Sequence, residues 1–161
     1  MKLLRKDACS TWLHVQGLVE SPYGQNELPH GTTYTRAIPP KTIDTARTAF
    51  ARISALNKKH PTLVVIWDWS STTEQPLPEP LQRLSGEIQP TTFDGSGIEF
   101  ASEESGSALD CIMYILSAQM TAYFYLPQPD ASVLIWEGEF IEIWTRDKCT
   151  ATAVRSVLSD C

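Results

Sequence analysis

The sequence contains no apolar run long enough to cross a membrane. Its longest apolar runs, Leu63–Trp67 and Cys111–Leu116, fall far short of the roughly 20 residues that a membrane-spanning helix needs. Residues 1–16 are basic in part but offer only Leu3 and Leu4 before charge returns, so the apolar centre of a secretory signal is missing. We therefore expect no membrane partner, no export by that route and a cytoplasmic location.

Cysteine and histidine are sparse and scattered, which argues against a metal site. The cysteines, Cys9, Cys111, Cys149 and Cys161, form no C-x-x-C pair and have no histidine at zinc-finger spacing. None of the three histidines has a second histidine or a carboxylate at a metal-binding spacing. In a reducing cytosol we expect free thiols, no structural zinc and no cofactor.

Nucleotide-binding and nucleophile motifs are missing as well. No series of βαβ units is apparent, and no glycine fingerprint follows a predicted strand. The segment Asp94-Gly95-Ser96-Gly97 has acidic neighbours and no lysine after it, so a tight turn explains it better than a phosphate loop. It also departs from the G-x-S-x-G nucleophile elbow, because Ser96 has glycine on each side.

Negative charge is concentrated in one part of the chain. The net charge is −6, but residues 1–60 carry nine basic and four acidic side chains, whereas residues 90–147 carry ten acidic side chains against one arginine. Such a field repels nucleic-acid phosphates and attracts a basic partner. We therefore expect no nucleic-acid partner; ordinary solubilising surface charge is the alternative explanation.

Hydrophobic periodicity predicts several helices. Apolar residues recur every three or four positions in Lys41–Asn57, where Thr42 can cap the first turn. A more apolar helix is predicted from Ser105 or Ser107 to Gln119. Asp147 is the predicted cap of a short C-terminal helix. Residues 3–19 also have helical spacing, although a short strand within them fits the pattern too.

The remaining pattern predicts strands and a fold class. Thr62–Trp69 is an apolar, β-branched run of the kind found inside a sheet, and Thr32–Ile38 and residues 93–101 each predict a short strand. Alternating prolines in Ser70–Pro90 favour extended backbone. The combination predicts one α+β domain over residues 1–161, a mainly antiparallel sheet with helices packed on one face.

The clearest sheet signal is Thr121–Thr145, which is rich in β-branched and aromatic residues. Turns are predicted at Gln128-Pro129-Asp130 and at Glu137-Gly138, the second as a two-residue loop. The pairs that this loop implies are Trp136 with Glu139 and Leu134 with Ile141. One hairpin face would then carry Leu134, Trp136, Ile141 and Ile143, and the other Val133, Ile135, Phe140, Glu142 and Trp144.

Both predicted hairpin faces are apolar, although a sheet with helices on one side normally has one polar face. Either a second segment, such as the loop Ser21–Pro40, the proline-rich segment or a helix, covers the second face, or a partner binds there. A binding face would use its aromatic residues as anchors and its carboxylates as a rim. The candidate partner-binding residues are Glu137, Glu139, Phe140, Glu142 and Trp144, together with Asp94, Glu99, Glu103 and Glu104.

The length, the acidic composition and this acidic, aromatic strand surface together resemble those of small bacterial immunity proteins, which neutralise toxins delivered by neighbouring cells. The resemblance implies a non-catalytic protein whose carboxylates mimic phosphates and mask the active site of a basic toxin domain. Two alternatives remain open. One is an enzyme that uses His30, Asp68 or Asp94 in a cleft, and the other is a structural subunit that buries the hairpin in a homo-oligomer.

Overall fold

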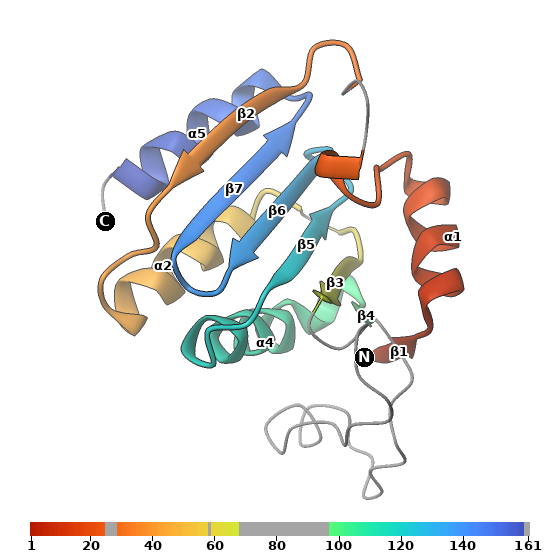
Figure 1. The fold of residues 1–161 in the computed structure, drawn as a ribbon, viewed down its shortest axis with the longest axis horizontal. Coiled ribbons are helices and arrows are strands. Elements are labelled where there is room, and N and C mark those ends of the chain that lie inside the picture. Colours follow the sequence, from red (N-terminus) through yellow and green to blue (C-terminus); the bar gives the residue numbers. More distant parts are fainter. Residues whose placement is uncertain (25–28, 58, 68–96, 160–161) are drawn as a thin grey trace, which may run out of the picture.

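The computed structural model describes residues 1–24, 29–57, 59–67 and 97–159 (Figure 1). Predictions for Asp68, Asp94, Cys161 and the segment 70–90 therefore lie outside the described residues. The described residues form an α+β fold around one antiparallel sheet, as the sequence predicts.

In the part of the chain that the structure describes, the sheet has seven strands in the order β1-β4-β3-β5-β6-β7-β2, and every neighbouring pair is antiparallel. The strands are β1 (Lys2–Leu4), β2 (Thr33–Ala37), β3 (Thr62–Ile66), β4 (Gly97–Phe100), β5 (Ala122–Leu126), β6 (Ala131–Trp136) and β7 (Phe140–Thr145). The predicted interior strand is confirmed, because β3 lies between β4 and β5. The two strands from the first quarter of the chain, β1 and β2, form the opposite edges of the sheet.

The helices of the described residues are α1 (Lys6–Gln16), α2 (Ile43–Ser54), α4 (Ser105–Ser117) and α5 (Lys148–Ser159), with short 3-10 turns η1 (Pro22–Gly24) and η3 (Ser102–Glu104). Two of the described helices, α2 and α5, begin at the capping residues that the sequence indicates. Thr42 Oγ1 accepts the Thr45 N–H at 3.2 Å, and Asp147 Oδ1 accepts the Cys149 N–H at 3.0 Å. These bonds satisfy amides that a helix leaves unpaired at its first turn, so both predicted caps are confirmed.

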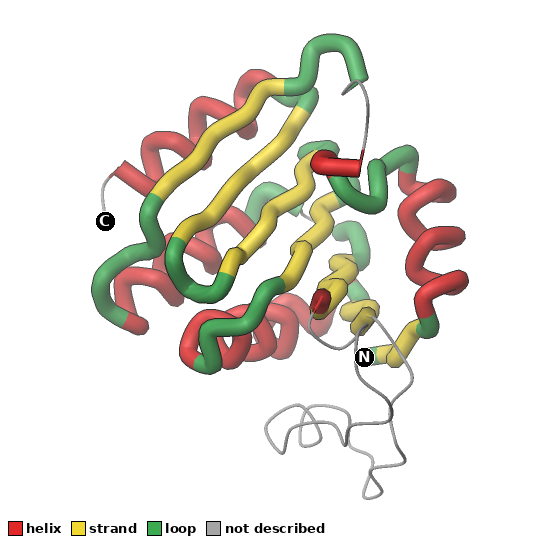
Figure 2. Tube along the Cα trace, viewed as in Figure 1, coloured by secondary structure: helices red, strands yellow, loops and turns green. Residues whose placement is uncertain are grey.

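Three helices cover one face of the sheet, which we call the helix face. Figures 1 and 2 show α2, α4 and α5 behind the strands. Phe50 from α2, Ile112 from α4 and Val154 from α5 share one buried cluster with Phe124 and Val133 of the sheet. Burying each large side chain of this kind contributes about 1.5–3 kcal/mol. This layer is therefore the main hydrophobic core.

Helix α1 packs on the opposite face of the sheet, near the β1 edge. Cys9, Leu13 and Leu18 form a second buried cluster with sheet residues that include Leu63 and Tyr125. Close contact is possible because β4 begins with Gly97, where a Cβ atom would lie 2.6 Å from Cys9 Sγ. Because α1 occupies only one end, it leaves the β6–β7–β2 part of this second face to other segments (Figure 1).

The predicted hairpin register is wrong by one residue. The connection between β6 and β7 contains three residues, Glu137 to Glu139, and it pairs Trp136 with Phe140. Glu137 adopts a left-handed φ of 47° and Gly138 one of 70°, whereas the prediction assigned a positive φ to Gly138 alone. Because side chains alternate along a strand, the shift reassigns every β7 side chain to the other face.

The corrected register separates apolar from mixed side chains. The helix face receives Val133, Ile135, Ile141 and Ile143. The second face receives Leu134, Trp136, Phe140, Glu142 and Trp144. Only the helix face is thus uniformly apolar, and the aromatic residues gather with a carboxylate on the other.

Candidate functional site

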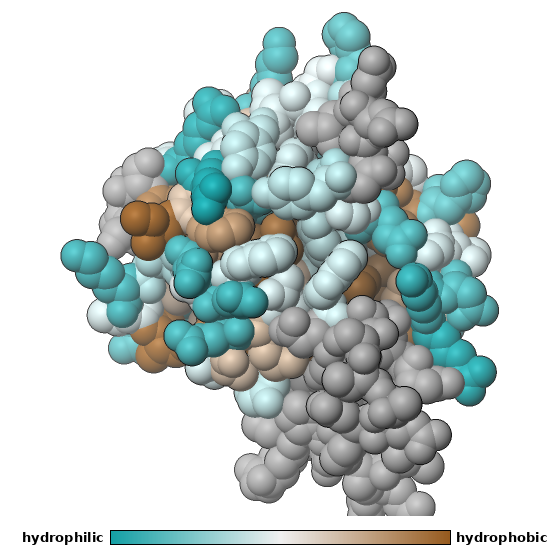
Figure 3. Space-filling view, in the orientation of Figure 1, coloured by the Kyte–Doolittle hydropathy of each residue, from teal (hydrophilic) through white to brown (hydrophobic). Residues whose placement is uncertain are grey.

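An open pocket lies on the second face, between the part of the sheet that α1 covers and the β6–β7 turn. Its volume is about 380 Å³, within the 300–1,000 Å³ common for ligand sites. The residues that line this aromatic pocket are Ser21, Tyr23, Trp67, Thr121, Tyr123, Leu134, Trp136 and Phe140. Figure 3 looks onto this face and shows pale and brown side chains over β5 to β7, with teal, hydrophilic side chains beside them.

Four segments that are far apart in the sequence position the aromatic side chains of this pocket. Trp67 directly follows β3, where its backbone N–H donates to the Thr121 carbonyl oxygen at 2.9 Å. Tyr123 is a buried β5 residue whose hydroxyl lies 3.0 Å from Ser21 Oγ. Trp136 and Phe140 flank the turn between β6 and β7. The pocket walls are therefore held by sheet pairing and by the segment that carries η1.

A buried carboxylate lies beside the aromatic pocket. Glu142 on β7 is 1% exposed. Tyr34 Oη donates to Glu142 Oε1 at 2.6 Å, and Tyr23 Oη donates to Glu142 Oε2. The Arg36 guanidinium lies 3.8 Å from Oε1. Two phenols and a cation thus compensate a charge that would be costly to bury alone. We call these four residues the Glu142 cluster.

The phenols of the Glu142 cluster are held in their protonated form. Desolvation, followed by the hydrogen bond to the Glu142 carboxylate, raises the pKa of Tyr23 well above its usual 10.0. The same two causes raise the pKa of Tyr34, with a partial opposing effect from Arg36. Desolvation also raises the pKa of Tyr123. The Tyr23 and Tyr34 hydroxyls therefore donate hydrogen bonds at neutral pH, and all three phenols are poor bases.

Stacked side chains connect the turn to the edge of the sheet. Trp136 and Phe140 stack with ring centroids 5.9 Å apart and planes 4° apart. On the other neighbouring strand, the Arg36 guanidinium carbon lies 3.8 Å from the centre of the Phe140 ring. Trp144 contacts Tyr23 edge-on at 5.4 Å and Tyr34 at 5.5 Å. The aromatic residues of this face thus form two groups, Trp136 with Phe140 and Trp144 with Tyr23 and Tyr34. Arg36 and Glu142 connect the two groups.

The predicted hairpin residues differ in their accessibility. Glu137 and Glu139 are exposed on the turn, and Phe140 is partly buried. Trp144 is only 6% exposed and Glu142 only 1%, because Tyr23 and Tyr34 lie over them. Tyr23 and Tyr34, two residues of the segment Ser21–Pro40 that was predicted as a cover, therefore cover this part of the second face, whereas the pocket itself is open. Glu142 and Trp144 are therefore buried beneath the accessible surface, where they contact Tyr23 and Tyr34.

The other predicted carboxylates lie apart from the hairpin turn. Glu99 accepts the Trp12 indole N–H at 2.9 Å, and Glu104 pairs with the Met1 ammonium group. That ammonium bond is the main cause of a lowered Glu104 pKa. Glu103 is exposed in η3, before α4, whereas Gly138 of the hairpin turn abuts the other end of α4 near Leu116. A helix of this length spans about 20 Å, so the two groups form separate surfaces.

The enzyme hypothesis gains no assembled site within the described residues. His30 is exposed on a turn, and its proposed companions Asp68 and Asp94 lie outside the described residues. Within the described ranges, no group of three or more His, Cys, Asp or Glu side chains could hold a metal ion. Across those same residues, no helix combines the length and apolarity needed to cross a membrane.

The three thiols among the described residues fall into two classes. Cys9, Cys111 and Cys149 are free, as predicted. Burial is the main cause that raises the pKa of Cys9 to about 11 and the pKa of Cys111 to about 12. Cys149 is exposed at the start of α5. The two buried thiols serve as packing groups and are unreactive in the folded chain.

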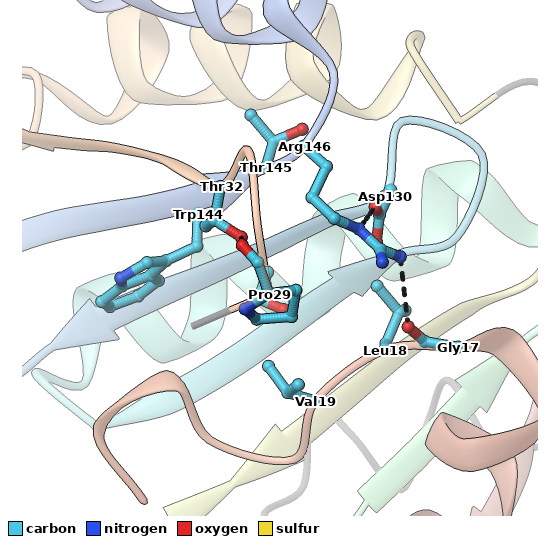
Figure 4. A pocket seen from close by; sticks show the side chains of 10 residues that line it. Gly17, Leu18, Val19, Pro29, Thr32, Asp130, Trp144, Thr145 and Arg146 are labelled. Carbon is cyan, nitrogen blue, oxygen red and sulfur yellow. Dashed lines mark hydrogen bonds and ion pairs between the residues drawn. The ribbon is translucent and has the colours of Figure 1, made fainter. Parts of the chain in front are cut away.

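A second, much smaller pocket lies at the far end of the hairpin (Figure 4). Its volume of about 30 Å³ leaves room for roughly one water molecule. Arg146 pairs with Asp130 through its Nε atom. A second guanidinium nitrogen, Nη2, donates to the Gly17 carbonyl oxygen at 3.4 Å. The contacts of Arg146 around this pocket hold the residue after α1 against the hairpin. The aromatic pocket is therefore the better candidate for a functional site.

Sequence reasoning missed several residues of the site, namely Tyr23, Tyr34, Arg36, Trp67, Tyr123 and Trp136. One signal was available for part of this set. A carboxylate placed among apolar residues in the middle of a strand, as Glu142 is, requires polar partners if it is buried. The turn-rich segment between residues 21 and 40 carries two tyrosines and an arginine that could supply them.

Comparison of the chain with protein-family models, with curated proteins and with solved structures found no match in any of the three.

Proposed function

We propose that this chain is a non-catalytic binding protein that inhibits a basic protein partner, a toxin domain, through the second face of its sheet. One observation carries the proposal: Trp136, Trp67 and Tyr23 are 40%, 55% and 64% exposed around one open pocket. Exposed aromatic residues clustered in this way are typical of binding surfaces, where truncating one costs about 2 kcal/mol or more.

The charge at the β6–β7 turn supports a basic partner. Glu137 and Glu139 extend from the turn that carries Trp136 and Phe140 on its two sides. They belong to the part of the chain that holds ten acidic residues against one arginine. A concentrated negative field accelerates association with a cationic surface and discriminates against anionic partners.

The state of the Glu142 cluster supports binding over catalysis. Both carboxylate oxygens of Glu142 accept phenolic hydrogen bonds, and the group lies beneath Tyr23 and Tyr34. The raised pKa values keep both phenols protonated, so neither is prepared to accept a proton. The cluster instead fixes η1 and β2 on the sheet and gives the surface a stable shape.

The test combines partner capture with association kinetics. The full chain is used to capture the product of the neighbouring reading frame at low salt, and the activity of that product is measured with and without the chain. We expect capture and inhibition. Failure of the purified neighbour to bind, together with an empty capture from the source cells, would contradict the proposal.

Charge reversal on the turn then locates the surface. We expect Glu137→Lys combined with Glu139→Lys to slow association severalfold at low salt, with a smaller difference at high salt because salt screens exposed charges. Glu103→Lys is the matched control, since Glu103 is an exposed carboxylate about 20 Å away at the opposite end of α4. Equal association rates for both variants would remove the hairpin from the interface.

Light scattering distinguishes this proposal from self-association. If the exposed aromatic residues bury against a second copy, the mass doubles at high protein concentration and Trp136→Ala restores the monomer. That result would replace the proposed partner with a homodimer.

A further inference from the structure

The chemistry of the aromatic pocket indicates what part of a partner it receives. Its walls are chiefly the rings of Tyr23, Trp67, Tyr123, Trp136 and Phe140, and among the described residues no charged side chain lines it. The polar groups that it offers include the hydroxyls of serine, threonine and tyrosine side chains. Aromatic faces carry partial negative charge, so they attract cations as well as apolar groups.

The surroundings of the pocket add negative charge. Glu137 and Glu139 lie on the turn that joins Trp136 to Phe140, and Glu142 follows Phe140 by two residues on the same face. Arg36, on the neighbouring strand β2, provides the compensating positive charge to Glu142. The remaining pair of turn carboxylates leaves this rim negative, which favours a cationic occupant over a neutral or an anionic one.

The fold already contains one example of the interaction that we infer. Arg36 places its guanidinium 3.8 Å from the centre of the Phe140 ring. The opposite neighbour of Phe140 is Trp136, stacked at 5.9 Å on the adjacent strand. Since Phe140 lies between Trp136 and Arg36 in the strand order, the free side of the Trp136 ring is the side toward the pocket. The stack therefore ends in an aromatic surface suited to a second guanidinium.

We propose that the aromatic pocket receives the guanidinium group of an arginine side chain from the partner, an inference that rests on the proposed function above. Arginine fits better than lysine because its planar guanidinium is weakly hydrated and stacks on aromatic rings, whereas an ammonium group keeps its water more strongly. The hydroxyls of Ser21 and Tyr123 supply acceptor oxygens for its N–H groups at the pocket wall.

The experiment uses the full chain and two small probes, N-acetyl-arginine amide and its citrulline counterpart. Citrulline has nearly the same shape but carries a neutral urea group instead of the guanidinium. Binding is followed by NMR at the tryptophan indole N–H signals, which Trp→Leu variants assign. We expect saturable shifts of the Trp136 and Trp67 signals with the arginine probe, and at least tenfold weaker binding of the citrulline probe.

Variants test the location of the site. Trp136→Leu and, separately, Trp67→Leu are expected to weaken binding of the arginine probe severalfold or more. Trp12→Phe is the control, because Trp12 lies on α1 and donates to Glu99 outside the pocket. Thermal unfolding of each variant checks that the fold is retained. Equal affinity for both probes, or shifts confined to residues outside the pocket, would overturn the inference, as would the absence of any shift.

The outcomes separate this inference from the proposed function. If a partner binds and Trp136→Ala releases it, but no arginine substitution in the partner weakens binding and the arginine probe produces no shift, only the inference fails. If the arginine probe binds selectively but no protein partner is inhibited, the pocket chemistry stands and the proposed function fails.

Discussion

Glu142→Gln is expected to destabilise the fold strongly, because it removes the charge from a carboxylate that is 1% exposed. The two phenolic bonds from Tyr23 and Tyr34 are charge-assisted, a type that contributes about 1.5–3 kcal/mol each. Glutamine keeps one carbonyl acceptor but turns an amide N–H₂ group toward the second phenol. We therefore expect a loss of about 2–4 kcal/mol in the free energy of unfolding.

The contribution of Arg36 to this loss is small. At 3.8 Å, a pair of unit charges in an effective dielectric of 20 attracts by about 4 kcal/mol. The Arg36 side chain is 55% exposed, however, and measured values for such solvent-screened pairs are about 1 kcal/mol or less. The two phenols therefore account for most of the expected effect.

Urea unfolding followed by tryptophan fluorescence measures the change, and the melting temperature should fall by roughly 5–15 °C in parallel. Glu139→Gln is the matched control, an exposed carboxylate in the same hairpin, for which we expect a change within about 0.5 kcal/mol. A double-mutant cycle with Tyr34→Phe should give a coupling energy of about 0.5–3 kcal/mol. If Glu142→Gln changes stability no more than Glu139→Gln does, the description of this cluster is incorrect.

Three further predictions follow from the packing and the pKa shifts. Gly97→Ala should cost about 1–3 kcal/mol in urea unfolding because its Cβ would lie 2.6 Å from Cys9 Sγ, and adding Cys9→Ala should recover part of that loss. In a variant without the terminal cysteine, Cys149 should react with a thiol reagent much faster than Cys9 and Cys111, because only Cys149 is exposed. Equally fast reaction of all three thiols would contradict the fold. Because folding raises the pKa values of Tyr23 and Tyr123 above 10.0, stability should be independent of their ionisation below pH 10 and should fall as pH rises further. Absorbance at the phenolate band should then show that some tyrosines of the folded chain ionise only at a pH above 10.0. Ionisation of all tyrosines of the folded chain with a pKa near 10.0 would refute this prediction.

Local signals were sufficient to predict most of the fold. The helix that begins after Thr42 has its apolar stripe, its cap and its stop within one stretch of sequence, so its existence depends little on the rest of the chain. The interior position of Thr62–Ile66 follows similarly from an unbroken apolar run. Fold class was predictable because these local preferences agree with the tertiary packing.

The hairpin register and the site depended on information that is not local. The turn has three residues instead of two and holds Glu137 in a left-handed conformation, of which the propensity of glutamate gives little sign. Tyr34 and Glu142 are separated by 108 positions in the sequence yet share a hydrogen bond. Composition indicated an acidic, aromatic surface, but only the strand order shows which aromatic residues surround a pocket.

The position of β2 at the far edge of the sheet has a consequence for how the molecule is made. Its only strand partner among the described residues is β7, whose register begins with Thr33 opposite Thr145. During synthesis, β2 therefore remains without that partner until more than a hundred further residues have been added, and closing so large a loop slows folding. Tyr23 likewise has no carboxylate to bind before β7 is present. The aromatic surface consequently matures late, after the C-terminal hairpin has formed, and a chain interrupted before β7 would lack it.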